Sequence, residues 1–226
     1  MRSSILLSFA ALATAVPTPQ FPGLPLGLLN ILPKYFENAA SGSCSLNQVT
    51  LPTSALPAPD AGLTLALVAV GRGTQNYTCA SSTSADKPTP NGALANLFNA
   101  SCLASYSNAN DLAMYTRYKE GKPKTQQGQY PLPLIGEHYF VDSTTPSFFL
   151  NVLGATELKK NATAPAPNAT ADVAWLKLEV QQAGTTSTVQ NVYRVNTVAG
   201  QPPATCDGLQ STFTVEYAAD YYFYSS

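Results

Sequence analysis

The chain contains a single histidine, His138, and imidazole is the side chain best suited to act as a general base near neutral pH. Arg194 could hold an anion, and Asp220 could assist the imidazole. These three residues are the candidates for an extracellular hydrolase. The alternatives are structural: His138 shares a strand face with Phe140, and Arg194 could form an ion pair with Asp220 or Glu216. No Gly-x-Ser-x-Gly sequence presents a nucleophilic serine, so we lean against catalysis.

Aromatic side chains suggest a second kind of site. Trp175, Tyr222 and Tyr224 could form a platform on which a sugar ring stacks. Aromatic residues that alternate along a strand also pack in protein cores, which is the competing interpretation. The three residues are therefore candidate binding residues for a neutral ligand such as a glycan.

Four cysteines, an even number, allow three disulfide pairings. We predict Cys79–Cys102 and Cys44–Cys206. The cysteines and the one histidine do not form a cluster with the spacing of a zinc site, so we expect no metal. Residues 71–76 (GRGTQN) lack the third glycine and the following helix of a dinucleotide-binding fingerprint, and we expect no cofactor.

The N-terminus predicts secretion. Residues 1–15 combine an early arginine, an apolar run and small residues, which predicts a signal peptide cleaved after Ala15. A Pro- and Leu-rich arm follows at 16–43, and one β-rich domain spans 44–226. No later apolar run is long enough to span a bilayer. Glycosylation sequons for a secreted glycoprotein stand at Asn76, Asn99, Asn161 and Asn168.

Composition limits the partners. Only 11% of the residues are charged and the formal net charge is −1, so nothing predicts nucleic-acid binding. The surface must instead be rich in neutral polar groups. This composition favours a partner such as a cell-wall polysaccharide or a host surface, and it leaves the oligomeric state open.

The elements that position these residues are predicted to be mainly strands. Residues 212–223 alternate for twelve positions, with Phe213, Tyr217 and Tyr221 on one face and Thr212 and Asp220 on the other. Further short β-branched or aromatic segments lie at 63–70, 74–79, 137–141, 147–153, 173–180 and 188–195. The fold class is therefore mainly β, an antiparallel β-sandwich or barrel with one short helix and long loops.

The helix is predicted near residues 91–102. Leu94, Leu97, Phe98 and Cys102 lie at helical spacing there, and Asn91-Gly92 could start the helix. Residues 159–171 are predicted to form a long polar loop, because they are rich in Asn, Pro and Ala.

Several segments taken together resemble a known family. They are 71–79 (GRGTQNYTC), 136–140 (GEHYF), the pair Trp175-Leu176, 192–197 (VYRVNT) and 217–224 (YAADYYFY). They resemble a family of secreted proteins of unknown function from filamentous ascomycetes, with bacterial relatives, whose members are often labelled malate dehydrogenase. The resemblance spans about residues 44–224. It implies one secreted, mostly β domain and supplies no catalytic residues.

The residues do not support the dehydrogenase label. That activity needs a dinucleotide fold, a His–Asp relay and arginines that grip two carboxylates. We therefore predict a secreted module that binds a neutral ligand at a cell surface, a cell wall or a host, with a hydrolase that uses His138 as the alternative.

Overall fold

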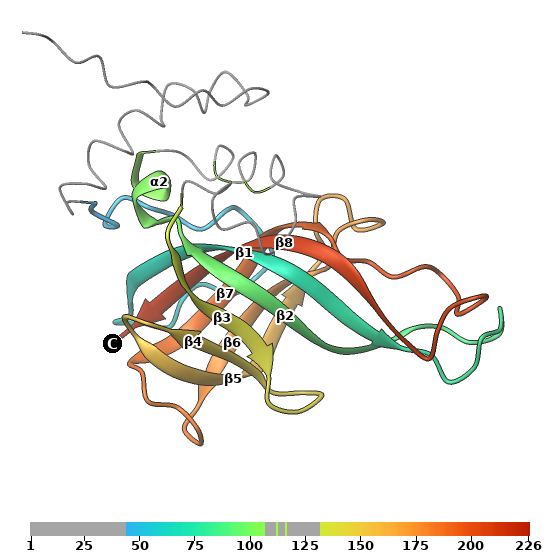
Figure 1. The fold of residues 1–226 in the computed structure, drawn as a ribbon. Helices are drawn as coiled ribbons and strands as arrows, with labels where there is room; N and C mark the ends of the chain where they lie inside the picture. Colours follow the sequence, from blue (N-terminus) through green and yellow to red (C-terminus); the bar gives the residue numbers. More distant parts are fainter. Residues whose placement is uncertain (1–43, 107–111, 113–115, 117–131) are drawn as a thin grey trace, which may run out of the picture.

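The computed structural model describes residues 44–106, 112, 116 and 132–226 (Figure 1). The predicted signal peptide, 1–15, and the predicted arm, 16–43, lie outside the described residues.

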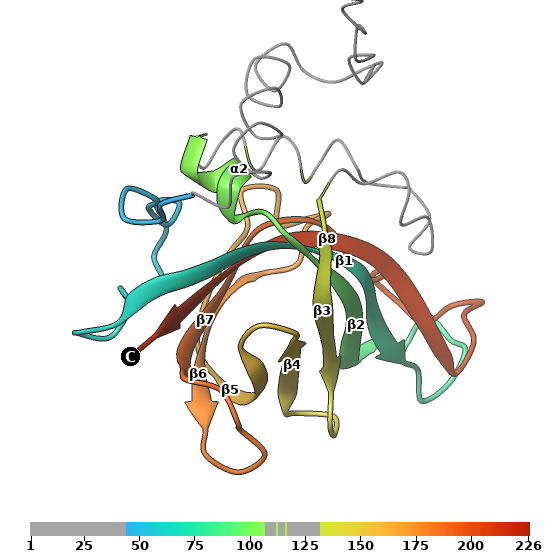
Figure 2. The same cartoon turned by 60° about the vertical axis from the view of Figure 1, so that its left-hand side comes forward.

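Eight antiparallel strands follow one another around a closed barrel (Figures 1 and 2). They are β1 (Thr64–Thr78), β2 (Thr89–Asn99), β3 (Leu134–Phe140), β4 (Pro146–Leu150), β5 (Gly154–Ala164), β6 (Trp175–Gln181), β7 (Val189–Ala199) and β8 (Thr212–Ser225). Each strand pairs with the next, and β8 returns to pair with β1. The predicted mainly β antiparallel fold is confirmed, and of the two architectures it is the barrel.

The second half of strand β8 is buried on both of its faces. The predicted alternation is confirmed at its start, where Thr212, Thr214 and Glu216 are exposed. From Tyr217 to Tyr224 every residue is buried, on both faces of the strand. One face therefore points into the barrel and the other lies beneath an outer layer of chain. A strand covered on both faces belongs to the centre of a fold, which suits its pairing with β1 and β7.

Two apolar clusters correspond to these two faces. The inner cluster, inside the barrel, includes Leu97, Phe148, Leu178, Val192 and Tyr221. The outer cluster includes, among others, Val68, Val70, Phe98, Leu103, Trp175, Tyr193, Val195, Tyr222 and Tyr224. It is covered by leucines and a valine of residues 44–63 and by the helix α2 (Ser101–Tyr106), which lies outside the barrel (Figure 2).

Polar contacts fix the covering segment, residues 44–63, to strands β6 and β7. Lys177 Nζ forms an ion pair with Asp60 at 2.6 Å and donates to the carbonyl oxygen of Ala58 at 3.0 Å. Asn191 Nδ2 donates to the other oxygen of Asp60, and Tyr193 donates to the carbonyl oxygen of Pro57. Because Lys177 is almost fully buried, this pairing satisfies a charge that would otherwise be costly to bury.

The helix lies later in the chain than predicted. Residues 89–99 form β2, and α2 begins at Ser101. The leucine and phenylalanine spacing fits a helix, but Ala93, Ala95 and Leu97 also fit the period of two, and they face the inner cluster. Pairing with β1 and β3 selects the strand.

Strand β5 replaces the first part of the predicted loop at 159–171. Lys159, Lys160 and Asn161 are exposed and lack the apolar signal of a strand. Lys159 and Lys160 nevertheless pair with β6, Asn161 lies at a bulge in the same strand, and Leu158 belongs to the inner cluster. Sheet register, which a single segment does not contain, decides this element.

Two glycines in β1 allow close approach. A Cβ on Gly71 would lie 2.4 Å from the ring of Tyr221, and one on Gly73 would lie 1.7 Å from the carbonyl oxygen of Leu94. Residues 71–73 are thus an uninterrupted part of β1 that leaves space for the Tyr221 ring inside the barrel.

The predicted disulfide pairing was wrong. The structure pairs Cys44 with Cys102 and Cys79 with Cys206. Cys79 follows the end of β1, whereas β2 carries the chain back to the other end of the barrel before Cys102. Since β1 and β8 are antiparallel neighbours, Cys79 instead meets Cys206, just before β8. Cys44–Cys102 ties the covering segment to α2.

We expect replacement of both Cys79 and Cys206 by serine to lower the free energy of unfolding by roughly 3–5 kcal/mol, because the bond closes a long loop. The sequence separation is 127 residues. Urea unfolding of the full chain measures the loss. Peptide mapping without reduction is the independent check, and a Cys79–Cys102 peptide would contradict the assignment.

Candidate functional site

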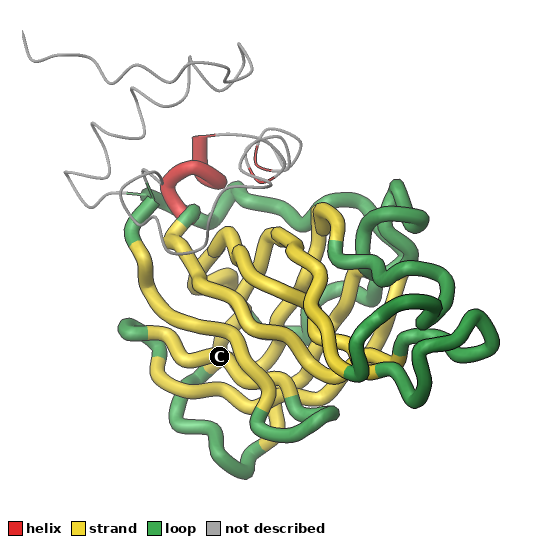
Figure 3. Tube along the Cα trace, turned by 45° about the vertical axis from the view of Figure 1, so that its right-hand side comes forward, coloured by secondary structure: helices red, strands yellow, loops and turns green. Residues whose placement is uncertain are grey.

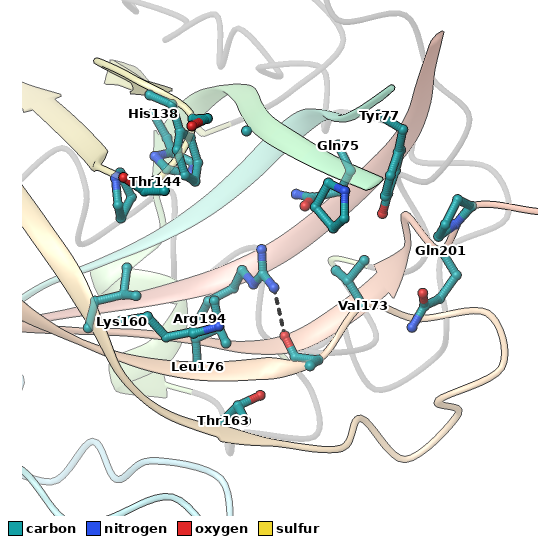
Figure 4. Close-up of a pocket in the computed structure, with 18 of the residues that line it drawn as sticks. Gln75, Tyr77, His138, Thr144, Lys160, Thr163, Val173, Leu176, Arg194 and Gln201 are labelled. Carbon is teal, nitrogen blue, oxygen red and sulfur yellow. Dashed lines mark hydrogen bonds between the residues drawn. The ribbon is translucent and has the colours of Figure 1, made fainter. Parts of the chain in front are cut away.

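The barrel contains a cavity of about 770 Å³ that is open to solvent (Figure 4). Its wall is mostly apolar and includes Phe140, Phe148, Leu176, Leu178 and Val173. The polar side chains that line it are Gln75, Tyr77, His138, Ser143, Thr144, Lys160, Thr163, Arg194, Gln201 and Tyr221. A cavity of this size, lined by both apolar and polar side chains, is typical of a small-molecule site.

Register places the arginine inside. Arg194 on β7 stands between Leu176 of β6 and Tyr221 of β8, both of which line the cavity. Asp220 pairs with Val195, one residue along, and so it projects from the opposite face of the sheet. The predicted ion pair between Arg194 and Asp220 is therefore wrong, and Glu216 lies on the outward face as well.

The guanidinium of Arg194 is only partly satisfied. Its Nη2 donates to the carbonyl oxygen of Ala174 at 2.8 Å (Figure 4). Its Nε is buried and has no hydrogen-bond partner among the described residues. The side chain lines the cavity, so this unmet donor lies in the cavity wall.

His138 also lines the cavity, as the hydrolase hypothesis requires. Its ring stacks on Phe148 with centroids 4.2 Å apart, and Nδ1 lies 2.9 Å from the carbonyl oxygen of Ser147. Burial lowers the pKa of His138 to about 4, so the ring is neutral near pH 7. The carbonyl orients the ring with Nδ1 as donor, which leaves Nε2 as an acceptor.

A general base also needs a nucleophile and an orienting partner. Ser143 and Thr144 line the cavity, but no described hydrogen bond joins either to His138. The stacking on Phe148 and the carbonyl contact match the structural alternative for this histidine. Geometry therefore gives binding more support than hydrolysis.

Two buried tyrosines, Tyr77 and Tyr221, complete the polar part of the wall. Tyr77 donates to the carbonyl oxygen of Gly200 at 2.7 Å, and the hydroxyls of Tyr217 and Tyr221 lie 2.9 Å apart. Burial raises the pKa of each of these tyrosines above the usual value. All three are therefore neutral at physiological pH and act as hydrogen-bonding groups.

The aromatic platform predicted from sequence is not at the cavity. Trp175, Tyr222 and Tyr224 belong to the outer cluster and are buried there. The covering segment, residues 44–63, packs against that cluster, so these rings have no free face for a sugar.

Asp220 lies in the same outer layer and is fully buried. Its carboxyl accepts hydrogen bonds from Thr116 Oγ1 and from Asn196 Nδ2, the latter at 2.7 Å. Burial raises the pKa of Asp220 to about 7, although both hydrogen bonds act in the opposite direction. Asp220 is therefore a structural acid and not a member of the cavity.

Sequence reasoning missed Gln75, Tyr77 and Lys160. Each is an ordinary polar residue on a strand, and no motif surrounds it. Period-two alternation within a correctly placed strand could have assigned the inward face, but β5 was predicted to be a loop at Lys160. Among the described residues, no three His, Cys, Asp or Glu side chains group closely enough to hold a metal ion.

The described chain forms an eight-stranded antiparallel barrel with a cavity in its interior (Figure 3). The chain belongs to the family described as "Protein of unknown function (DUF3455)", which matches residues 59–225. No curated protein and no solved structure matches the chain. The described part of the chain has no helix that is long and apolar enough to cross a membrane.

We expect Asp220 to make stability depend on pH. Between about pH 4 and pH 7 the folded state holds a proton that the unfolded state has released, so this stabilisation is complete below about pH 4 and is lost as pH rises through 7. From pH 5 to pH 8 the wild type should lose about 2–3 kcal/mol relative to Asp220→Asn. Urea unfolding of both proteins at several pH values measures the free energies of unfolding. If the wild type and Asp220→Asn give parallel plots of this free energy against pH, the prediction is wrong.

Proposed function

We propose that the protein binds a small molecule with a largely apolar body inside the barrel. The observation that supports this most is the cavity of about 770 Å³, whose wall includes the apolar side chains of Phe148, Leu176 and Leu178 as well as polar side chains. Eight-stranded barrels have an interior wide enough for one small ligand. The proposal keeps the binding role expected from sequence and moves the site from the outer aromatic residues to the interior.

The apolar wall narrows the ligand. A glycan presents hydroxyl groups on every side, and each would need a partner when desolvated. Phe148, Leu176 and Leu178 offer none. These contacts favour a ligand with an apolar body over a polysaccharide chain.

We also propose that the protein acts outside the cell. Two disulfides are typical of an oxidising compartment, and the predicted signal peptide at 1–15 gives a route to it. A binding protein at a cell surface, a cell wall or a host would then capture or carry its ligand extracellularly.

Filling part of the cavity should weaken binding. We expect the full chain to bind the neutral fluorescent probe N-phenyl-1-naphthylamine, and Leu176→Trp to weaken that binding at least about fivefold, because an indole would occupy the space of the ligand. Leu176 lines the cavity and is partly buried. Fluorescence titration gives the affinities.

The matched control is Leu94→Trp. Leu94 is 53% exposed and does not line the cavity, so this variant should bind like the wild type. Circular dichroism confirms that both variants fold. Absence of probe binding by the wild type, or equal weakening in both variants, would contradict the proposed site.

Secretion also predicts glycan occupancy. Asn168 is exposed in the turn after β5, and its Oδ1 accepts a hydrogen bond from Thr170 of the same sequon at 2.9 Å. Asn76 and Asn99 are half-buried, and Nδ2 of Asn161 donates a hydrogen bond to Glu179. We expect Asn168→Gln to remove one glycan mass from protein made in a eukaryotic secretory host. Asn99→Gln serves as the control. An unchanged mass for Asn168→Gln would contradict the prediction.

A further inference from the structure

We infer that the ligand of the barrel is an acid, whose carboxylate is held by Arg194 while its apolar body occupies the inner wall. This inference rests on the proposed function and adds the chemical class of the ligand. It replaces the neutral ligand expected from composition, because the charge inside the cavity differs from that of the chain as a whole.

The first argument is an unpaired cation. Arg194 and Lys160 both line the cavity, and within the described residues neither forms an ion pair. The described lining residues include no Asp or Glu. Elsewhere in the described structure a buried cation has a counter-charge, because Lys177 forms an ion pair with Asp60. A cation in a partly desolvated apolar chamber is costly without a counter-charge, and an anionic ligand would supply one.

The second argument is the unmet donor of the arginine. Arg194 uses Nη2 on the carbonyl oxygen of Ala174, which fixes the plane of the guanidinium. Its buried Nε has no partner in the described structure. Figure 4 shows the guanidinium reaching into the cavity. A carboxylate has two oxygens that accept such bonds, and charge-assisted bonds of this kind are strong.

The third argument is the surroundings of the arginine. Next to it on the neighbouring strands are Leu176 and Tyr221, and Phe148 and Leu178 continue the wall. Low polarity around a guanidinium strengthens its attraction for an anion. The combination suits a molecule with a carboxylate at one end and an aliphatic or aromatic body.

Lys160 gives a weaker, outer contribution. It pairs with Leu178 across β5 and β6, so its side chain points toward the cavity, but it is exposed. Solvent screens an exposed charge, so Lys160 should attract the acid without fixing it. Its neighbour Lys159 pairs with Glu179 on the outward face and provides a matched control.

The test compares decanoate with methyl decanoate and decanol, three ligands with the same apolar body. Each displaces N-phenyl-1-naphthylamine from the full chain between pH 6 and pH 8, where decanoate is ionised and His138 is neutral. We expect decanoate to bind at least about tenfold more tightly than the ester or the alcohol.

Single substitutions then show which side chain causes the preference for the acid. Arg194→Gln should lower decanoate affinity about 10- to 100-fold and leave the ester and the probe within about twofold. Lys160→Gln should lower decanoate affinity by about two- to threefold, mainly at low salt, and Lys159→Gln should leave it unchanged. The acid-to-ester ratio of the wild type tests the inference even if Arg194→Gln fails to fold.

The outcomes separate the two proposals. If the probe binds but acid, ester and alcohol displace it equally, the acid inference is overturned and the binding site stands. If Arg194→Gln weakens acid and ester alike, the arginine supports the wall and does not hold the anion. If neither the probe nor any of the three ligands binds, the proposed function itself fails.

Discussion

The pairing of β8 with β1 is the constraint on which the rest of the structure depends. Residues 212–225 pair along nearly the whole length of 64–78, and this joins the last strand to the first. Closure removes both sheet edges and defines an inside and an outside. The Cys79–Cys206 bond secures one end of the same pairing. Without this pairing, Arg194 and His138 would line an open sheet instead of a chamber.

Closure also explains the second core. The outer faces of β1, β7 and β8 are apolar, and a barrel leaves such faces exposed unless another segment covers them. Residues 44–63 and α2 supply that cover, fixed by the Cys44–Cys102 bond and the Lys177–Asp60 pair. The aromatic rings that suggested a sugar platform are thus used for stability, and the interior is left available for binding.

The interior combines two kinds of polar residue. Tyr77, Tyr221 and His138 are neutral and satisfied by carbonyls or by a neighbouring hydroxyl, so they shape the wall. Arg194 is positioned just as firmly but retains an unused donor. In a close-packed protein, buried groups that lack partners are uncommon, so the unmet donor of Arg194 sets it apart from the other polar residues of the wall.

The sequence by itself determined the mainly β class, the alternation of β8 and most strands, because these follow from local periodicity and side-chain shape. It also carried the family resemblance. The tertiary structure decided the disulfide partners, the strands β2 and β5, and the cavity residues Gln75 and Lys160. Each of these depends on register between strands far apart in the chain, and a shift of one residue exchanges the inside for the outside. Arg194 and Asp220 show this most clearly, since one step in register separates a cavity cation from a buried structural acid.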